Sequence, residues 1–244
     1  MELDEYERMA TAETAHWWYG TTRALLQDLL GPRLPPGGRF LDAGGGTGAT
    51  GAWMGDAGAV VLADVELLAL QLAHRDHPEV DGAVLADVSA LPFAEGSFDA
   101  ALCVTVLCHE LVPDPAATVR ELARAVRPGG YVCLMEPGVR RLRRAHDRVT
   151  HSARRFSRRD LAALVTGAGL ELVRSTAAYS FLVPPAAVKA VIERGRVASD
   201  IDRNEGGLVG LLPRLARAER ALLRRVDLPA GLSVLAIGRK PTPR

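Results

Sequence analysis

Glycines at every second position follow an aspartate between residues 40 and 48. The residues read FLDAGGGTG, so an apolar run ends in Asp42 and leads into Gly44, Gly46 and Gly48. Glycine permits tight backbone turns and lets a ligand approach the main chain closely. About sixteen residues later, Asp64 ends a second apolar run. A carboxylate at that place in a doubly wound sheet can accept hydrogen bonds from both ribose hydroxyls. The pattern predicts a nucleoside-binding site.

The same glycines allow a second interpretation. Residues 46–51 read GTGATG and satisfy the dinucleotide fingerprint GxGxxG, which is weak evidence by itself. An NAD-dependent oxidoreductase is therefore an alternative, and a glycine-rich turn without a ligand is another. Two features speak against a dehydrogenase: Asp42 stands two residues before Gly44, and the sequence has no Tyr-x-x-x-Lys pair for hydride chemistry on an alcohol.

Strand-like and helix-like stretches that alternate from about residue 38 to 178 must position these groups. This alternation predicts a parallel sheet with crossover helices in the gaps between its strands. A helix over Pro115 to Val126 is expected to stop at the Pro-Gly-Gly turn of residues 128–130. The expected strands are Arg39 to Ala43, Ala59 to Asp64, Gly82 to Ala86, Ala100 to Leu107, Tyr131 to Glu136, Leu170 to Thr176 and Leu232 to Arg239.

The expected chain organisation is a single α/β domain over residues 1–244, because this length suits one large domain. Residues 1–35 are expected to form an N-terminal helical lid, and residues 36–178 the cofactor-binding core. Residues 179–230 would form a helical insertion, either a substrate cap or a dimer surface that is amphipathic near Leu211, Leu215 and Leu222. Residues 231–244 would supply the last strand and a tail.

Several motifs together resemble the class I S-adenosylmethionine-dependent methyltransferases, in particular their bacterial small-molecule, type-11-like subgroup. Asp42, Gly44, Gly46 and Gly48 meet the family's form acid-x-Gly-x-Gly-x-Gly. The resemblance covers residues of about 38 to 136, with a departure at Gly45, where a cysteine is common. Further matching segments are ADVSALPF at residues 86–93, GSFD at 96–99, TVLCHE at 105–110, ELARAVRPGG at 121–130 and ETAHWWY at 13–19.

The resemblance implies a Rossmann-like, doubly wound and mostly parallel seven-stranded sheet with an antiparallel last strand and helices on both faces. It implies S-adenosylmethionine as cofactor, S-adenosylhomocysteine as product and no metal. Methyl transfer to oxygen, nitrogen or carbon of a small molecule would follow by in-line displacement, with positioning as a large part of catalysis. The residues expected to bind the cofactor are Tyr19, Arg23, Asp42, Gly44, Gly46, Gly48, Asp64, Val65, Asp87, Val88 and Thr105.

Histidines and arginines supply the candidates for catalysis and acceptor binding. His109 follows the fourth strand, at the sheet edge where such folds bind ligands, and is interpreted either as a catalytic or substrate contact or as a structural histidine. From residue 140 to 159 there are nine arginines. Within this stretch His146 or His151 could act as a base, and Arg154 or Arg155 could clamp a carboxylate or phosphate. A solvated basic face and nucleic-acid binding are the alternatives for the stretch.

Aromatic residues gather in the expected N-terminal helix. Trp17 and Trp18 are expected either to contact the substrate as part of a lid or to dock the helix on the core. Arg23, one helical turn after Tyr19, could pair with the methionine carboxylate of the cofactor.

Composition narrows the partners. The formal net charge is +1, so no overall charge attracts nucleic acid or an anionic membrane. An acidic N-terminus and the lack of a long apolar segment predict a cytoplasmic protein with three reduced cysteines. The expected partner is a small-molecule acceptor, and the arginines make an anionic acceptor one possibility. The expected oligomeric state is a monomer or homodimer. A further alternative is a protein of this fold that binds S-adenosylmethionine without methylating.

Overall fold

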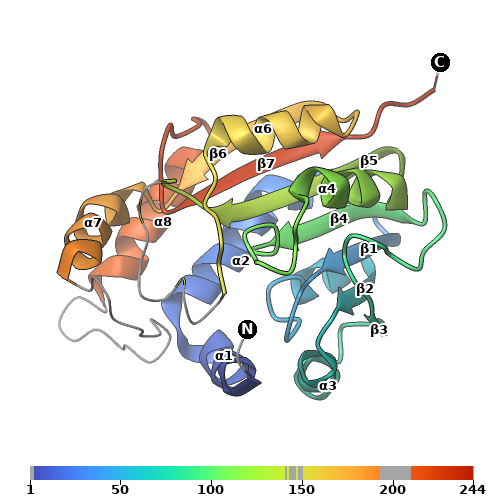
Figure 1. Cartoon of the computed structure of the whole chain (residues 1–244), viewed down its shortest axis with the longest axis horizontal. Helices are drawn as coiled ribbons and strands as arrows, with labels where there is room; N and C mark the ends of the chain where they lie inside the picture. The colour runs from blue at the N-terminus through green and yellow to red at the C-terminus, as the bar shows by residue number, and fades with distance from the viewer. Residues whose placement is uncertain (1–2, 141, 143–146, 148–150, 193–209, 244) are drawn as a thin grey trace.

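Seven strands form one sheet in the order β3-β2-β1-β4-β5-β7-β6 (Figure 1). The structure is a computed structural model that describes residues 3–140, 142, 147, 151–192 and 210–243. β7 runs antiparallel to both its neighbours, β5 and β6, while the pairs among β1 to β5 are parallel. The predicted mostly parallel sheet with an antiparallel last strand is confirmed. The strands are β1 (Gly38–Ala43), β2 (Gly58–Asp64), β3 (Gly82–Leu85), β4 (Phe98–Val104), β5 (Val126–Pro137), β6 (Glu171–Ala178) and β7 (Ser233–Arg239).

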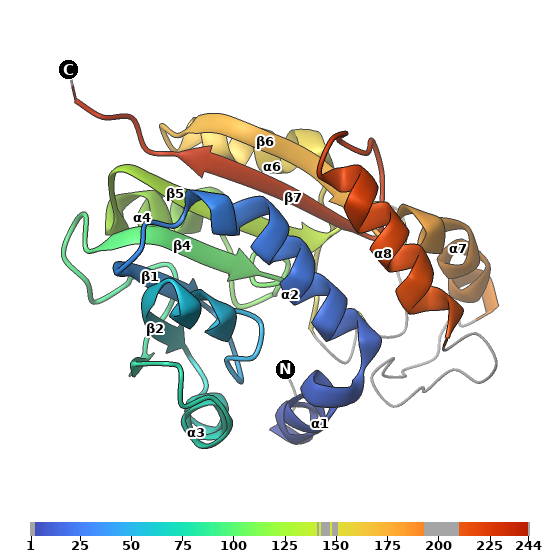
Figure 2. The same ribbon diagram turned by 180° about the vertical axis from the view of Figure 1, so that it is seen from behind.

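Helices cover both faces of the sheet because the central strands are apolar on both sides. Leu41 and Val61 belong to the core beneath α4 (Pro115–Ala125) and α6 (Arg158–Gly167), while Phe40 and Val60 belong to the core beneath α2 (Trp17–Leu30). Figure 2 shows α2 and α8 (Leu211–Leu223) lying over this second face. On the same side α3 (Leu67–Asp76) packs on β2 and β3. The predicted doubly wound arrangement is therefore present.

Helices do not fill every gap between strands, which corrects the sequence-based expectation. Between β1 and β2 lies only the short 3₁₀ helix η2 (Ala52–Asp56), and the described residues 86–97 between β3 and β4 hold no helix. Four glycines at positions 44, 45, 46 and 48 weaken helix formation after β1, and Pro92 and Gly96 do so before β4. The chain therefore continues as a loop after β1 and after β3.

The remaining elements lie before β1 and between β6 and β7. They are α1 (Leu3–Ala15), η1 (Gly31–Arg33), η3 (Ser180–Leu182) and α7 (Val183–Ile192). The predicted insertion before the last strand contains the helices α7 and α8, whereas residues 224–230 are not helical, and residues 193–209 lie outside the described residues. Among the helices that the structure describes, none is long and apolar enough to cross a membrane.

A buried carboxylate at the end of β5 holds the loop that follows β4. Glu136 accepts hydrogen bonds from the backbone N–H groups of Val106 (3.1 Å), Leu107 (2.8 Å) and Cys108 (3.0 Å). Burial raises the pKa of Glu136 to about 7, against the lowering effect of these donors. β4 ends at Val104, short of the predicted Leu107, because Thr105 turns the backbone into the left-handed region (φ 57°) toward this carboxylate.

We predict that Glu136→Gln lowers the free energy of unfolding by about 1–3 kcal/mol, because an amide N–H₂ would face backbone donors and leave one of them unsatisfied. The measurement is urea unfolding at pH 8. Glu171→Gln, on the exposed start of β6, is the matched control and should change stability by less than about 0.5 kcal/mol. Equal stability of the two variants would show that Glu136 does not hold the loop.

Candidate functional site

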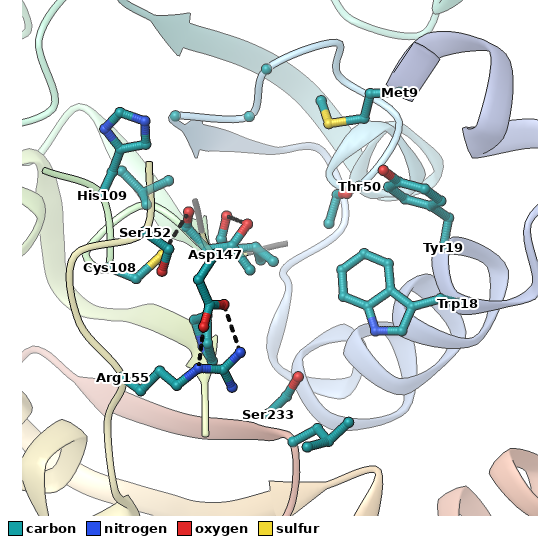
Figure 3. Close-up of a pocket in the computed structure, with 18 of the residues that line it drawn as sticks. Met9, Trp18, Tyr19, Thr50, Cys108, His109, Asp147, Ser152, Arg155 and Ser233 are labelled. Carbon is teal, nitrogen blue, oxygen red and sulfur yellow. Dashed lines mark hydrogen bonds and ion pairs between the residues drawn. The ribbon is translucent and has the colours of Figure 1, made fainter. Parts of the chain in front are cut away.

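A cavity of about 720 Å³ lies at the carboxyl ends of β1, β2 and β4 (Figure 3). The strand order reverses between β1 and β4, so this is the switch point at which open α/β sheets bind ligands. The volume falls in the range usual for small-molecule sites. One part of the wall comes from the glycine loop and the ends of β2 and β3. The other part comes from α1, α2, the loop after β4, α7, and Asp147, Ser152 and Arg155.

The alternating glycines of the loop after β1 adopt the left-handed backbone conformation that glycine tolerates better than other residues. Gly44, Gly46 and Gly48 all have positive φ angles, of 70°, 58° and 87°. Gly44 and Gly46 line the cavity, and a Cβ on Gly44 would overlap the side chain of Val106. Gly48 is outside the lining, where a Cβ would lie 3.2 Å from Cβ of Ala73 on α3, so it serves the packing of this helix.

Asp64 and Asp87 mark the ends of β2 and β3 beside this loop. Asp64 is buried and lines the cavity, and its two oxygens accept the N–H groups of Gly46 (2.9 Å) and Glu66 (3.0 Å). Burial raises the pKa of Asp64. Oδ1 of Asp87 accepts from the N–H and the hydroxyl of Ser89, at 2.8 and 2.7 Å. The predicted cofactor residues Asp87, Val65, Val88 and Thr105 also line the cavity.

Asp42 lies under the glycine loop with an unused oxygen. Its side chain is 2% exposed, it lines the cavity, and Oδ2 has no hydrogen-bond partner among the described residues. A Cβ on Gly45 or Gly51 would collide with this oxygen, so only glycine fits at both positions. Burial, followed by the charges of Asp64 and Glu13, raises the pKa of Asp42 to about 8. A buried carboxylate of this kind suits a ligand that brings a positive charge or a donor.

Glu13 joins the N-terminal helix to the glycine loop, a contact that the sequence analysis did not predict. Its Oε1 accepts from the hydroxyl of Thr47 at 2.6 Å, and the buried carboxyl lines the cavity beside Asp42. Arg23, expected to bind the cofactor, lies outside this lining. Its guanidinium donates to the carbonyl oxygen of Glu13 (3.2 and 3.3 Å) and borders a separate hollow with Trp53.

An aromatic wall from α2 faces the far side of the cavity. Trp17, Trp18 and Tyr19 line it, and both tryptophan rings also contact Tyr179, with centroids 6.1 and 6.4 Å apart. The tryptophans therefore dock the helix and contribute to the cavity at once. Tyr179 is buried, holds a left-handed φ of 59°, and its hydroxyl lies 2.7 Å from that of Thr22. Leu111, Val112, Leu182, Ala186, Leu212 and Leu232 continue this apolar wall.

His109 lies at the cavity and is half-buried. Burial lowers its pKa, so the neutral imidazole predominates at pH 7. Nδ1 accepts from the N–H of Leu111 at 3.2 Å, and a neutral ring that accepts at Nδ1 carries its proton on Nε2. His151 is outside the lining: its Nδ1 lies 2.7 Å from Oε1 of Glu110, and its ring stacks 6.1 Å from that of His109. His146 lies outside the described residues.

The arginines expected to clamp an anion already have partners within the chain. Arg155 lines the cavity, but it forms a buried two-point ion pair with Asp147, at 3.0 and 2.6 Å (Figure 3). It also donates to the carbonyl of Gly138. Arg154 is outside the lining and donates to the carbonyl of Val112 at 2.8 Å. Asp147, adjacent to His146 in the sequence, was not among the predicted site residues.

Comparison with known proteins agrees with this geometry. Residues 41–134 match a family model described as a methyltransferase domain. A relative from Renibacterium salmoninarum named demethylmenaquinone methyltransferase is 34% identical over 129 residues, which are 52% of this chain and 50% of the relative. The chain thus spans about half the length of the curated relatives that it matches.

Solved structures share the fold across most of the chain. A chain from the Haloferax volcanii complex of the Trm112 methyltransferase activator with a methyltransferase superposes with a TM-score of 0.62 and 18% identity, covering 98% of both chains. Haemonchus contortus phosphoethanolamine N-methyltransferase 2, solved with S-adenosyl-L-methionine, gives 0.60 and 20%, covering 92% of this chain and 53% of that one. Residues 41–134 are thus similar to a methyltransferase domain, and the chain shares the fold of these solved structures.

Proposed function

We propose that this protein transfers a methyl group from S-adenosylmethionine to an oxygen, nitrogen or carbon nucleophile of a small molecule. The observation that carries the proposal is the cavity at the switch point, where the glycine loop, Asp64 and Asp87 converge. In that arrangement Asp64 would hold the ribose hydroxyls, while Gly44 and Gly46 let the cofactor approach the backbone. The resemblance to the methyltransferases implies that Asp87 would face the adenine amino group. The same glycines also fit the dinucleotide fingerprint, so NAD binding is the alternative that the titration described below must distinguish.

The described residues fit this cofactor. Asp42 offers an unpartnered buried oxygen, and the loop glycines leave space that any side chain would fill. When bound, S-adenosylmethionine supplies an electrophilic methyl group. The chain's own contribution is to orient the acceptor and exclude water, and in-line positioning of the reacting atoms can supply several kcal/mol of the rate enhancement.

We further propose that the acceptor has a largely apolar body and contacts His109. The wall formed by Trp17, Trp18 and the aliphatic residues around Leu182 supports this proposal. His109 would act as a hydrogen-bond donor through Nε2, since its Nδ1 is engaged with Leu111. An anionic acceptor has less support, because Arg155 is neutralised by Asp147. The relative's name makes demethylated quinones one class for an acceptor screen.

Residues 1–35 would act as a lid and residues 179–230 as a cap, as parts of one domain. Contacts from Glu13, Trp17 and Trp18 on one side, and from Ala186 and Leu212 on the other, support this division. Leu211, Leu215 and Leu222 are exposed on α8, so light scattering remains the test of a homodimer. The cytoplasmic location also stays a prediction from the sequence.

The first prediction concerns cofactor identity. We expect S-adenosylmethionine and S-adenosylhomocysteine to bind in calorimetric titration, and Asp64→Ala to weaken both by about 10- to 100-fold, the cost of losing hydrogen bonds to a charged group. Asp56→Ala, on an exposed residue of η2, is the control and should bind as the unaltered protein does. Saturable binding of NAD without binding of either sulfur compound would overturn the proposal.

The second prediction concerns His109. If it donates one hydrogen bond to the acceptor, His109→Gln should reduce kcat/KM for the acceptor about 3- to 10-fold and leave cofactor affinity unchanged. Loss of about 100-fold or more, together with an altered pH profile, would instead identify a general base. The readout is formation of S-adenosylhomocysteine with an acceptor from the screen. His74→Gln, on the exposed side of α3, serves as control.

A further inference from the structure

Three buried carboxylates from three different elements meet at the glycine loop. Glu13 comes from α1, Asp42 from the end of β1 and Asp64 from the end of β2, with exposed fractions of 4%, 2% and 6%. All three line the same cavity. Like charges gathered out of water repel one another and are costly to ionise, so such a group needs protons or a cation.

The described residues leave two of these carboxylates short of positive charge. Oδ2 of Asp42 has no hydrogen-bond partner among the described residues, and Oε1 of Glu13 accepts from the neutral hydroxyl of Thr47. Arg23 is the nearby cation, but its guanidinium donates to the backbone oxygen of Glu13 rather than to the carboxyl. Asp64 differs, since two backbone N–H groups satisfy its oxygens. Glu13 and Asp42 are therefore the two carboxylates that lack a compensating positive charge.

We infer that Glu13 is a cofactor-contact residue: with Asp42 it receives the positively charged end of S-adenosylmethionine, and binding of that charge releases a proton from the pair to solvent. The inference rests on the proposed function, and it gives a specific role to Glu13, the first residue of the N-terminal segment that resembles the methyltransferases. Because Thr47 ties Glu13 to the glycine loop, the same contact draws α1 onto the bound cofactor.

The direction of the pH dependence follows from the environment of the pair. Burial raises the pKa of Glu13 to about 7, with Thr47 and Arg23 opposing and Asp76 adding to the rise. The pKa of Asp42 is raised to about 8 by burial and by Asp64 and Glu13. In the free protein both groups thus hold protons at pH 6. A cation within about 4–6 Å lowers a carboxyl pKa by about 1–3 units, so cofactor affinity should rise between pH 6 and pH 8.

The test is calorimetry with S-adenosylmethionine at pH 6.5 in buffers of different ionisation enthalpy, which counts the protons released. The unaltered protein should release about one proton, and Glu13→Gln should release measurably fewer. At pH 8 Glu13→Gln should bind about tenfold more weakly, and at pH 6 the difference should shrink, because the unaltered protein must then first lose a proton. Glu7→Gln, exposed on the same helix, should match the unaltered protein in both respects.

Thermal melting without ligand checks that the variants fold. It also gives an independent measure of the ionisation of Glu13. An acid whose pKa is raised in the folded state destabilises that state as pH rises through this pKa. Between pH 6 and pH 8 the melting temperature of the unaltered protein should therefore fall more than that of Glu13→Gln. Thr47→Val keeps the carboxyl but removes its hydrogen bond, so it should retain proton release.

Two results separate this inference from the function on which it rests. If the cofactor binds and Glu13→Gln shows the same affinity and the same proton count as Glu7→Gln, Glu13 is not a cofactor contact, and the methyltransferase proposal stands. If the unaltered protein binds no S-adenosylmethionine at either pH, the proposed function itself fails and the inference fails with it.

Discussion

The placement of an ionisable aspartate beneath a loop of glycines is the constraint on which the site depends. Asp42 ends β1 in the middle of the sheet, where burial makes its charge costly. Side chains at positions 45 and 51 would collide with its carboxyl, so the loop can wrap this group only with glycine. Because these glycines disfavour a helix, the chain after β1 forms a loop. In this loop the backbone of Gly44 and Gly46 faces the cavity beside Asp64.

The second half of the cavity depends on contacts between elements far apart in the sequence. Glu136 at the end of β5 fixes the loop from Val106 to Cys108. The buried pair of Asp147 and Arg155 fixes the wall beyond that loop. In Figure 3, Trp18 and Tyr19 of α2 lie across the cavity from His109 and Arg155. The cofactor side is thus built from adjacent strand ends, whereas the acceptor side is assembled from loops and terminal helices.

This difference explains what could be predicted from the sequence. Strand periodicity and glycine spacing are local, so the parallel strands and the positions of Asp42, Gly44 and Asp64 were predictable, whereas the antiparallel β7 was expected only from the resemblance to the methyltransferases. The missing helix between β3 and β4 could have been anticipated from Pro92 and Gly96 had their effect been weighed. Glu13 begins the segment ETAHWWY that resembles the methyltransferases, but this local pattern did not predict the role of its carboxyl, because the contact is with Thr47, 34 residues away. Nor could the sequence show that Arg23 turns to the carbonyl of Glu13, or that Asp147 already pairs with Arg155, since both are tertiary contacts.

The most direct measurement of the central claim is a crystal structure of the protein grown with S-adenosylhomocysteine. We predict density for the adenosine in the cavity at the ends of β1, β2 and β3, with both ribose hydroxyls on the carboxylate of Asp64 and the amino acid end beside Asp42 and Glu13. Density at another place on the molecule, or a cavity without ligand at saturating concentration, would contradict the account.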